Sequence, residues 1–197
     1  MRLILASGST ARAALLKNAG LEFSVVPADV DEAAIKSKML QQSADASSIS
    51  ASLALEKAVR VSRSNPDAIV IGADQVLLFD GRIFDKPANM AEARSHLLTL
   101  RGLTHSLVSA VSVVIAGQEM WTTSQTAFLS MRDFSEPFLD AYLEKFGADA
   151  LTSVGAYHLE GLGSQLFSHI EGDYFTILGL PLLPLLEFLR SQDIVPT

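Results

Sequence analysis

The chain has 197 residues, of which 49% are hydrophobic and 19% charged, a composition that supports one large globular domain and excludes a disordered chain. Its formal net charge of −7 argues against a wide surface for nucleic acid or anionic membranes, but not against a small polyanion held in a local basic pocket. The absence of cysteine excludes disulfides, thiolate catalysis and zinc–thiolate sites, and we expect a cytoplasmic protein.

The first third of the chain predicts strands and helices in alternation. A short apolar run over residues 3–5 predicts a buried strand, and residues 10–18 predict a helix. A second strand is expected over residues 22–27, followed by an acidic loop over residues 29–32. Apolar residues at helical spacing predict a further helix over residues 49–61.

The middle of the chain predicts a change from parallel to antiparallel pairing. A continuous apolar run over residues 68–71 predicts a central buried strand that ends at Gly72-Ala73-Asp74. Because Asp-Gly suits a tight primed turn, Asp80-Gly81 predicts a hairpin between residues 76–79 and 82–84.

The remaining elements complete a mixed architecture. They are a helix opened by Asn89 and Glu92 and closed by Gly102, strands over residues 105–116 and 121–131, a helix over residues 135–146 and, after more strands, a final buried helix within residues 176–189. That last stretch is too short and too interrupted by glycine and proline to cross a bilayer, so we expect no membrane partner. The order predicts an α/β fold with a mixed central sheet, in one compact unit over residues 1–197 that is compatible with two lobes and a substrate cleft.

The first turn of the chain is a candidate anion site. Ser7-Gly8-Ser9 lies between a predicted strand and a predicted helix, where free backbone N–H groups and the helix dipole favour an anion. Arg12, one turn into the helix, could grip a phosphate with two hydrogen bonds. An ordinary Ser-capped helix with a surface arginine explains the same residues.

Asp74 is a candidate catalytic group because it follows the predicted central strand. Ligands of open α/β sheets bind at the carboxyl ends of strands, and a carboxylate there can hold a divalent metal or activate water. An aspartate that bonds local backbone in a turn is the alternative.

Other charged residues could complete such a site. Glu32 could add a metal ligand, although an acidic loop is also compatible with simple solvation. Lys57 and Lys86 each suit the surface when taken singly, but together with Arg12 they would supply the positive charge that a triphosphate needs.

A series of short motifs resembles the Maf family of nucleotide pyrophosphatases. They run in the family's order from residue 3 to about residue 190 and therefore span nearly the whole chain. They are Leu5-Ala6-Ser7-Gly8-Ser9-Thr10-Ala11-Arg12, Asp31-Glu32, Leu55-Glu56-Lys57-Ala58, Ile71-Gly72-Ala73-Asp74-Gln75, Lys86-Pro87, Gly155-Ala156-Tyr157, Glu160-Gly161-Leu162-Gly163, and Gly172-Asp173-Tyr174 with Gly179-Leu180-Pro181-Leu182.

The resemblance implies an enzyme that splits a nucleoside triphosphate into the monophosphate and pyrophosphate, usually as a homodimer. It implies that Asp74 is the catalytic base. It also implies that the enzyme needs a divalent cation, Mg²⁺ or Mn²⁺, for which Asp74 and Glu32 are the candidate ligands. Five positions are implied to line the phosphate end of the substrate: Ser7, Ser9, Arg12, Lys57 and Lys86.

Two branches of the family differ where the base is recognised. The branch that prefers 7-methyl-GTP has Gln after the aspartate and Glu in the late glycine motif, and Gln75 and Glu160 match it. Ala11 matches neither that branch nor the one that prefers dTTP and UTP. The implied substrate is 7-methyl-GTP, because a carboxylate can accept the N–H groups of a cationic methylated guanine. The alternatives are a dTTP/UTP or broad-specificity pyrophosphatase, and a non-catalytic nucleotide-binding protein associated with cell division.

Overall fold

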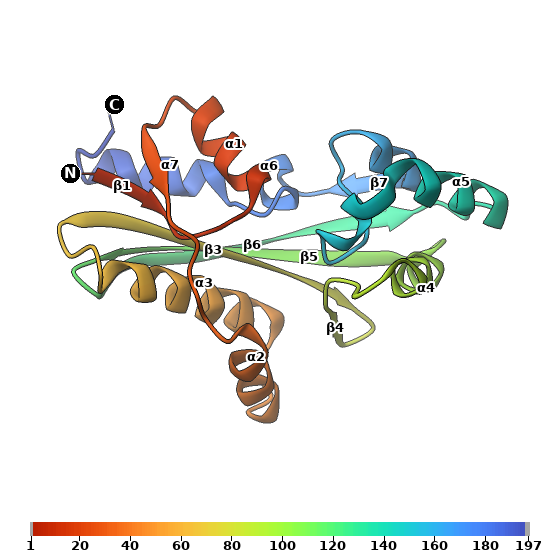
Figure 1. Cartoon of the computed structure of the whole chain (residues 1–197), viewed down its shortest axis with the longest axis horizontal. Helices are drawn as coiled ribbons and strands as arrows, with labels where there is room; N and C mark the ends of the chain where they lie inside the picture. Colours follow the sequence, from red (N-terminus) through yellow and green to blue (C-terminus); the bar gives the residue numbers. More distant parts are fainter. Residues whose placement is uncertain (1, 196–197) are drawn as a thin grey trace. The chain divides into compact units, whose positions relative to one another are not determined.

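The computed structural model describes residues 2–195, and within them seven strands form one sheet in the order β2-β1-β3-β5-β6-β7, with β4 paired to β3 (Figure 1). The strands are β1 (Arg2–Leu5), β2 (Phe23–Val25), β3 (Ala68–Phe79), β4 (Arg82–Phe84), β5 (Thr104–Ile115), β6 (Gln118–Met131) and β7 (Phe167–Glu171). The α-helices are α1 (Thr10–Asn18), α2 (Glu32–Gln41), α3 (Ala46–Ser62), α4 (Met90–Leu100), α5 (Glu136–Phe146), α6 (Tyr174–Ile177) and α7 (Leu182–Ser191), and two 3-10 helices are η1 (Gly147–Leu151) and η2 (Leu162–Leu166).

The sheet is mixed, which confirms the predicted α/β fold. Strand β1 pairs in parallel with β2 and β3, whereas β4 is antiparallel to β3 and β7 is antiparallel to β6. Internal contacts group the chain into two units. Unit 1 comprises Met1–Gln75, Val108–Gln125 and Asp173–Thr197, and unit 2 comprises Val76–Leu107 and Thr126–Gly172.

The core of unit 1 lies on both faces of its part of the sheet. Successive residues of a strand point to opposite faces, so a strand buried on both sides is apolar throughout. One face packs against α1 and α7 and the other against α3 (Figure 1). The first face buries Leu3, Leu5, Ile69 and Ile71, and the second buries Ile4, Ala6, Ala68 and Val70.

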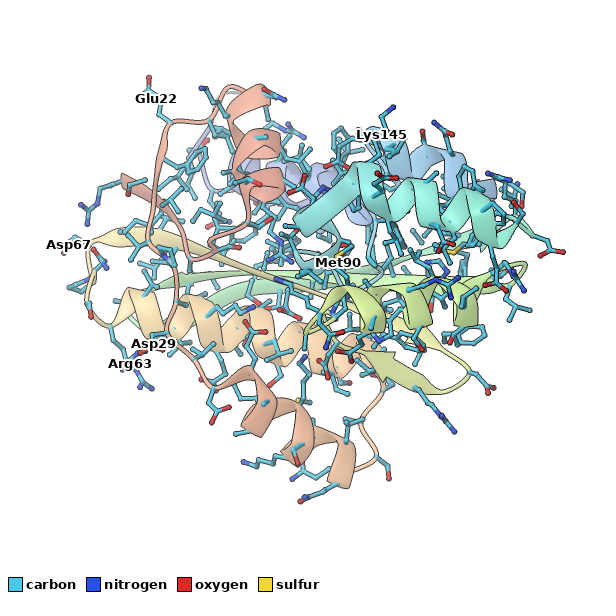
Figure 2. All side chains as sticks on the ribbon, turned by 45° about the vertical axis from the view of Figure 1, so that its right-hand side comes forward. Glu22, Asp29, Arg63, Asp67, Met90 and Lys145 are labelled. Atoms are coloured by element: carbon cyan, nitrogen blue, oxygen red, sulfur yellow. The ribbon has the colours of Figure 1, made fainter. Side chains whose placement is uncertain are left out.

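Charged side chains of unit 1 gather at the ends of its elements. Figure 2 shows Glu22, which precedes β2 in the sequence, and Asp29, which follows it. It also shows Arg63 and Asp67 at the turn between α3 and β3, and all four residues are exposed. No helix among residues 2–195 has the length and apolar character that crossing a membrane requires.

The predicted end of the central strand at Gly72-Ala73-Asp74 is wrong, because β3 continues without a break to Phe79. Gly72 serves a close helix contact rather than a turn. A Cβ atom at this position would lie 2.8 Å from the backbone nitrogen and 2.9 Å from the Cβ of Ala58 on α3. The glycine therefore lets α3 approach β3 closely, as glycine in a strand often does.

The prediction of an acidic loop over residues 29–32 is also wrong at its end. Asp31 is the N-cap of α2, its side chain accepts a hydrogen bond from the backbone N–H of Ala34 at 2.9 Å, and Glu32 is the first helical residue. Helix α2 buries none of its residues, so it lacks the apolar periodicity by which sequence patterns reveal a helix.

Two turn signals in unit 2 are confirmed. Asp80 and Gly81 both have positive φ angles, 49° and 71°, as a primed hairpin turn between β3 and β4 requires. Asn89 caps α4 by accepting a hydrogen bond from the backbone N–H of Glu92, whose carboxylate in turn accepts one from the backbone N–H of Ala88.

A buried histidine–tyrosine pair lies in the core of unit 2. His105 is 2% exposed, and its Nε2 is 2.7 Å from the hydroxyl oxygen of Tyr157. Its Nδ1 is buried without a hydrogen-bond partner among the described residues. Burial lowers the pKa of His105 to about 4, because the protonated ring would lose its hydration.

We predict that the free energy of unfolding falls as the pH is lowered from about 6.5 to about 4. The unfolded chain takes up the His105 proton near its ordinary pKa, whereas the folded chain resists it until about pH 4. The full loss is about 3 kcal/mol, at about 1.4 kcal/mol per pH unit. The measurement is urea unfolding of the wild type and of His105→Gln, which does not titrate. Equal pH dependence of the two proteins would exclude His105 as the cause.

Candidate functional site

The guanidinium group of Arg12 joins three segments of unit 1 that are far apart in the sequence. Its Nε donates to the carbonyl oxygen of Gly179 at 2.7 Å, and its Nη1 donates to Ala73 O at 2.9 Å and to the hydroxyl of Ser7 at 3.1 Å. Ser9 caps α1, since its side chain accepts from the backbone N–H of Arg12 at 3.4 Å. The helix-cap interpretation of Ser9 is therefore confirmed, while the surface-arginine interpretation of Arg12 is wrong.

Two opposing influences act on the charge of Arg12. Burial lowers the pKa of Arg12 below its ordinary value, because its surroundings remove water from the cation. The negative charges of Asp74 and Glu32 oppose this shift and favour the protonated form. Arginine starts from so high a pKa that the group stays charged at neutral pH.

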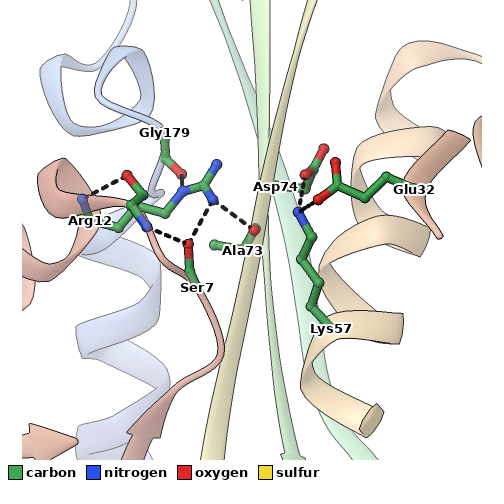
Figure 3. Close-up of polar contacts among 8 residues, drawn as sticks. Ser7, Arg12, Glu32, Lys57, Ala73, Asp74 and Gly179 are labelled. Carbon is green, nitrogen blue, oxygen red and sulfur yellow. Dashed lines mark hydrogen bonds and ion pairs between the residues drawn. The ribbon is translucent and has the colours of Figure 1, made fainter. Parts of the chain in front are cut away.

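Lys57 forms an ion pair with two carboxylates on the other side of the Ala73–Asp74 segment (Figure 3). Its Nζ is 2.6 Å from Oδ1 of Asp74 and 2.8 Å from Oε1 of Glu32. The side chains of Lys57 and Asp74 are 10% and 8% exposed, whereas that of Glu32 is 46% exposed. Lys57 is thus not the surface lysine that its position alone suggested, and Glu32 is paired rather than only solvated.

Asp74 lies inside β3 but just beyond the end of its parallel neighbour. The pairing of β1 with β3 stops at Leu5 and Ile71, and the chain then leaves the sheet through Ser7 and Ser9 into α1. Asp74 therefore keeps a position beside the carboxyl end of β1, where ligands of open α/β sheets bind. The alternative of a turn-forming aspartate is wrong, because Asp74 lies in a strand and bonds Lys57.

These residues can be compared with those of known proteins. The family model for Maf-like proteins matches residues 2–192 of this chain. The chain belongs to the Maf-like family. A nucleoside triphosphate pyrophosphatase of Paramagnetospirillum magneticum is 54% identical over 98% of this chain and all of its own length. A 7-methyl-GTP pyrophosphatase of Brucella abortus is 47% identical over 99% of this chain and 98% of its own length.

Gln75 of this Maf-like chain has its side-chain amide engaged within unit 1. Its Nε2 donates toward the hydroxyl of Ser109 at 3.0 Å and toward the carbonyl oxygens of Thr176 and Ile177 at 3.1 and 2.9 Å. Ala11 is half-buried at the start of α1. That both residues recognise the base stays a prediction.

The two remaining candidates, Lys86 and Glu160, belong to unit 2. Lys86 is exposed after β4 and precedes the buried Pro87, and Glu160 is exposed in the segment before η2. Their roles in binding phosphate and base stay predictions.

Sequence reasoning missed the backbone and neutral partners of the site. The carbonyl oxygens of Ala73 and Gly179 hold Arg12, and Ser109 and the Thr176–Ile177 carbonyls hold Gln75. Backbone carbonyls carry no signal in residue type. The late motif Gly179-Leu180-Pro181 was the one available hint, because it is among the motifs shared with the Maf family, but the resemblance implies no role for it.

We predict that Lys57→Met lowers the free energy of unfolding by about 3 kcal/mol, because it leaves the carboxylate of Asp74 in a buried position without its partner. Chemical denaturation at neutral pH measures this loss. The double variant Lys57→Met/Asp74→Asn should recover much of the lost free energy of unfolding, since it no longer buries an unpaired carboxylate.

Glu32→Gln is the matched comparison on the exposed side of the same lysine. It should cost less than about 1 kcal/mol, as water already screens that pair. Equal losses from Lys57→Met and Glu32→Gln would contradict a buried Lys57–Asp74 pair as the main interaction.

Proposed function

We propose that this chain hydrolyses a nucleoside triphosphate to the nucleoside monophosphate and pyrophosphate. The observation that carries the proposal is the placement of a carboxylate, Asp74, between two cationic groups, Arg12 and Lys57 (Figure 3). The pyrophosphatase names of relatives that match nearly the whole chain support the same reaction.

In the proposed reaction Asp74 is the general base. Lys57 binds Oδ1 and thereby fixes the orientation of the carboxylate, so Oδ2 is the oxygen that accepts a proton from the attacking water. The water oxygen forms a bond to the α-phosphorus, and the bond from that phosphorus to the oxygen bridging to the β-phosphate breaks. Pyrophosphate leaves with the electron pair of that bond.

The phosphate end of the substrate would meet Arg12. The hydrogen bonds of Arg12 to Gly179, Ala73 and Ser7 use Nε and Nη1, which leaves the donors of Nη2 for a phosphate oxygen. Because these bonds hold the guanidinium before substrate arrives, little reorganisation accompanies the growth of charge on the leaving pyrophosphate. Lys86 is the further cation that we propose for this charge.

A divalent cation, Mg²⁺ or Mn²⁺, fits the carboxylates present. Asp74 and Glu32 lie close together, since each places one oxygen within 2.8 Å of Nζ of Lys57, and we propose that these two carboxylates would hold the ion. Mg²⁺ is commonly bound by one or two carboxylates together with substrate phosphates. When bound, it would polarise phosphate oxygens and offset their charge. A homodimer and a cytoplasmic location also stay predictions.

We predict that Asp74→Asn abolishes pyrophosphate release, by about a hundredfold or more in kcat, because the amide cannot take a proton. The measurement is a coupled pyrophosphate assay, with circular dichroism to show that the variant is folded. Asp67→Asn is the control, since Asp67 is exposed at the turn before β3 (Figure 2). Near-normal turnover by folded Asp74→Asn would sink this mechanism, and a wild type that binds nucleotides without hydrolysing them would favour the non-catalytic binding protein.

For the base we propose 7-methyl-GTP, and we predict a higher kcat/KM for it than for GTP, dTTP and UTP, by about tenfold or more. Glu160 would accept the N–H donors of the methylated guanine, so Glu160→Gln should reduce this preference. Glu171→Gln, at an exposed position of β7 in the same unit, should leave it unchanged. A wild type that prefers dTTP or UTP would support the alternative substrate class.

A further inference from the structure

The residue after Asp74 is tied to a segment at the other end of the chain. The two amide hydrogens of Gln75 face three acceptors within 3.1 Å: the hydroxyl of Ser109 and the carbonyl oxygens of Thr176 and Ile177. Two of these acceptors are carbonyls, which cannot donate. The NH₂ group and not the amide oxygen must therefore point there, and both of its hydrogens can be engaged.

Ser109 can also accept a hydrogen bond from the NH₂ group of Gln75. Its hydroxyl is fully buried and donates to Thr176 O at 2.7 Å, so its oxygen is free to accept from Gln75. The side chain of Gln75 thus meets acceptors on two elements, β5 and α6, and all of them belong to unit 1.

The residue before Asp74 is tied to the same distant segment through Arg12. The carbonyl of Ala73 accepts from Nη1 of Arg12, and Nε of the same guanidinium donates to Gly179 O, two residues beyond Ile177. Gly179 has a φ of +93°, and a Cβ atom there would lie 3.2 Å from Nε of Arg12. Both neighbours of Asp74 in the sequence are therefore bound to the same distant segment. Gln75 binds residues 176–177, and Ala73 is linked through Arg12 to residue 179.

The distant segment is itself firmly held. Thr176 is fully buried, and its hydroxyl oxygen lies 2.9 Å from Oε1 of Gln125 and 3.1 Å from Oδ2 of Asp173, so its single hydrogen has an acceptor in either direction. Asp173 also caps α6 by accepting from the backbone N–H of Thr176 at 2.8 Å. A segment fixed in this way can serve as the reference against which the backbone around Asp74 is positioned.

We propose that Gln75 is a positioning residue for Asp74, and that it acts by tying β3 to residues 176–177. The proposal rests on the proposed function, in which the Asp74 carboxylate is the general base. A base must be held within hydrogen-bond reach of its water, and small displacements of a catalytic group cost large factors in rate. The tie uses the NH₂ group of Gln75, which faces acceptors on β5 and α6.

The test is Gln75→Met, which keeps the length of the side chain and removes both donors. We expect kcat to fall about tenfold for 7-methyl-GTP, GTP, dTTP and UTP alike, with KM within about twofold and the ratios among the four unchanged. Hydrogen exchange of the backbone amides in residues 176–180 should become faster. Gln118→Met, at the exposed start of β6, is the matched control and should change neither quantity.

Ser109→Ala tests the same tie from β5 and remains informative should Gln75→Met fail to fold. It should lower kcat in the same direction by a smaller factor, and the double variant should lose less than the product of the two factors, because both residues serve one interaction.

Two results would overturn the inference while leaving the proposed function intact. One is a Gln75→Met enzyme with unchanged kcat on its best nucleotide and altered ratios among the four, which would show base recognition. The other is unchanged kcat together with unchanged exchange at residues 176–180. A wild type that hydrolyses none of the four nucleotides would instead overturn the proposed function, and the positioning role with it.

Discussion

The arrangement of unit 1 depends on one cation, the half-buried guanidinium of Arg12. It links the first turn, the centre of β3 and the segment after α6, which are far apart in the sequence. Removing water from such a charge is costly, and the cost is offset here by two carbonyl oxygens, one hydroxyl and the attraction of two nearby carboxylates. A planar group with five donors can serve three acceptors at once, which lysine with its single ammonium nitrogen could not do in the same geometry.

The charges around Asp74 nearly cancel, and this balance bears on how a polyanion could bind. Arg12 and Lys57 are offset by Asp74 and Glu32, so unit 1 presents little net positive charge at this point. A triphosphate brings several negative charges, and two cations already paired with carboxylates neutralise them only in part. The balance therefore favours a mechanism that recruits a further cation, which is the physical reason for proposing both a divalent metal and Lys86.

The sequence predicted the local features of this fold well and the long-range ones poorly. The helix over residues 10–18 and the hairpin at Asp80-Gly81 have the expected positions, because capping and turn chemistry act between neighbouring residues. The interruption predicted at Gly72 was wrong because a glycine that breaks a strand and one that admits a helix look the same in sequence. The burial of Lys57 was equally hidden, since it depends on a partner 17 residues away. Asp74 and Arg12 could be singled out by position, but the carbonyl groups that hold Arg12 could not.

Two glycines set how closely the cations approach Asp74. Gly72 lies two residues before Asp74 on β3, so both positions face α3, and the missing Cβ lets α3 come near enough for Lys57 to reach the carboxylate at 2.6 Å. Gly179 acts on the opposite side, where a Cβ would press on the guanidinium that binds Ala73 O. A single methyl group on either side would move one cation away from the same short segment of β3. The geometry around Asp74 is therefore fixed as much by where the chain lacks side chains as by the charged groups that it carries.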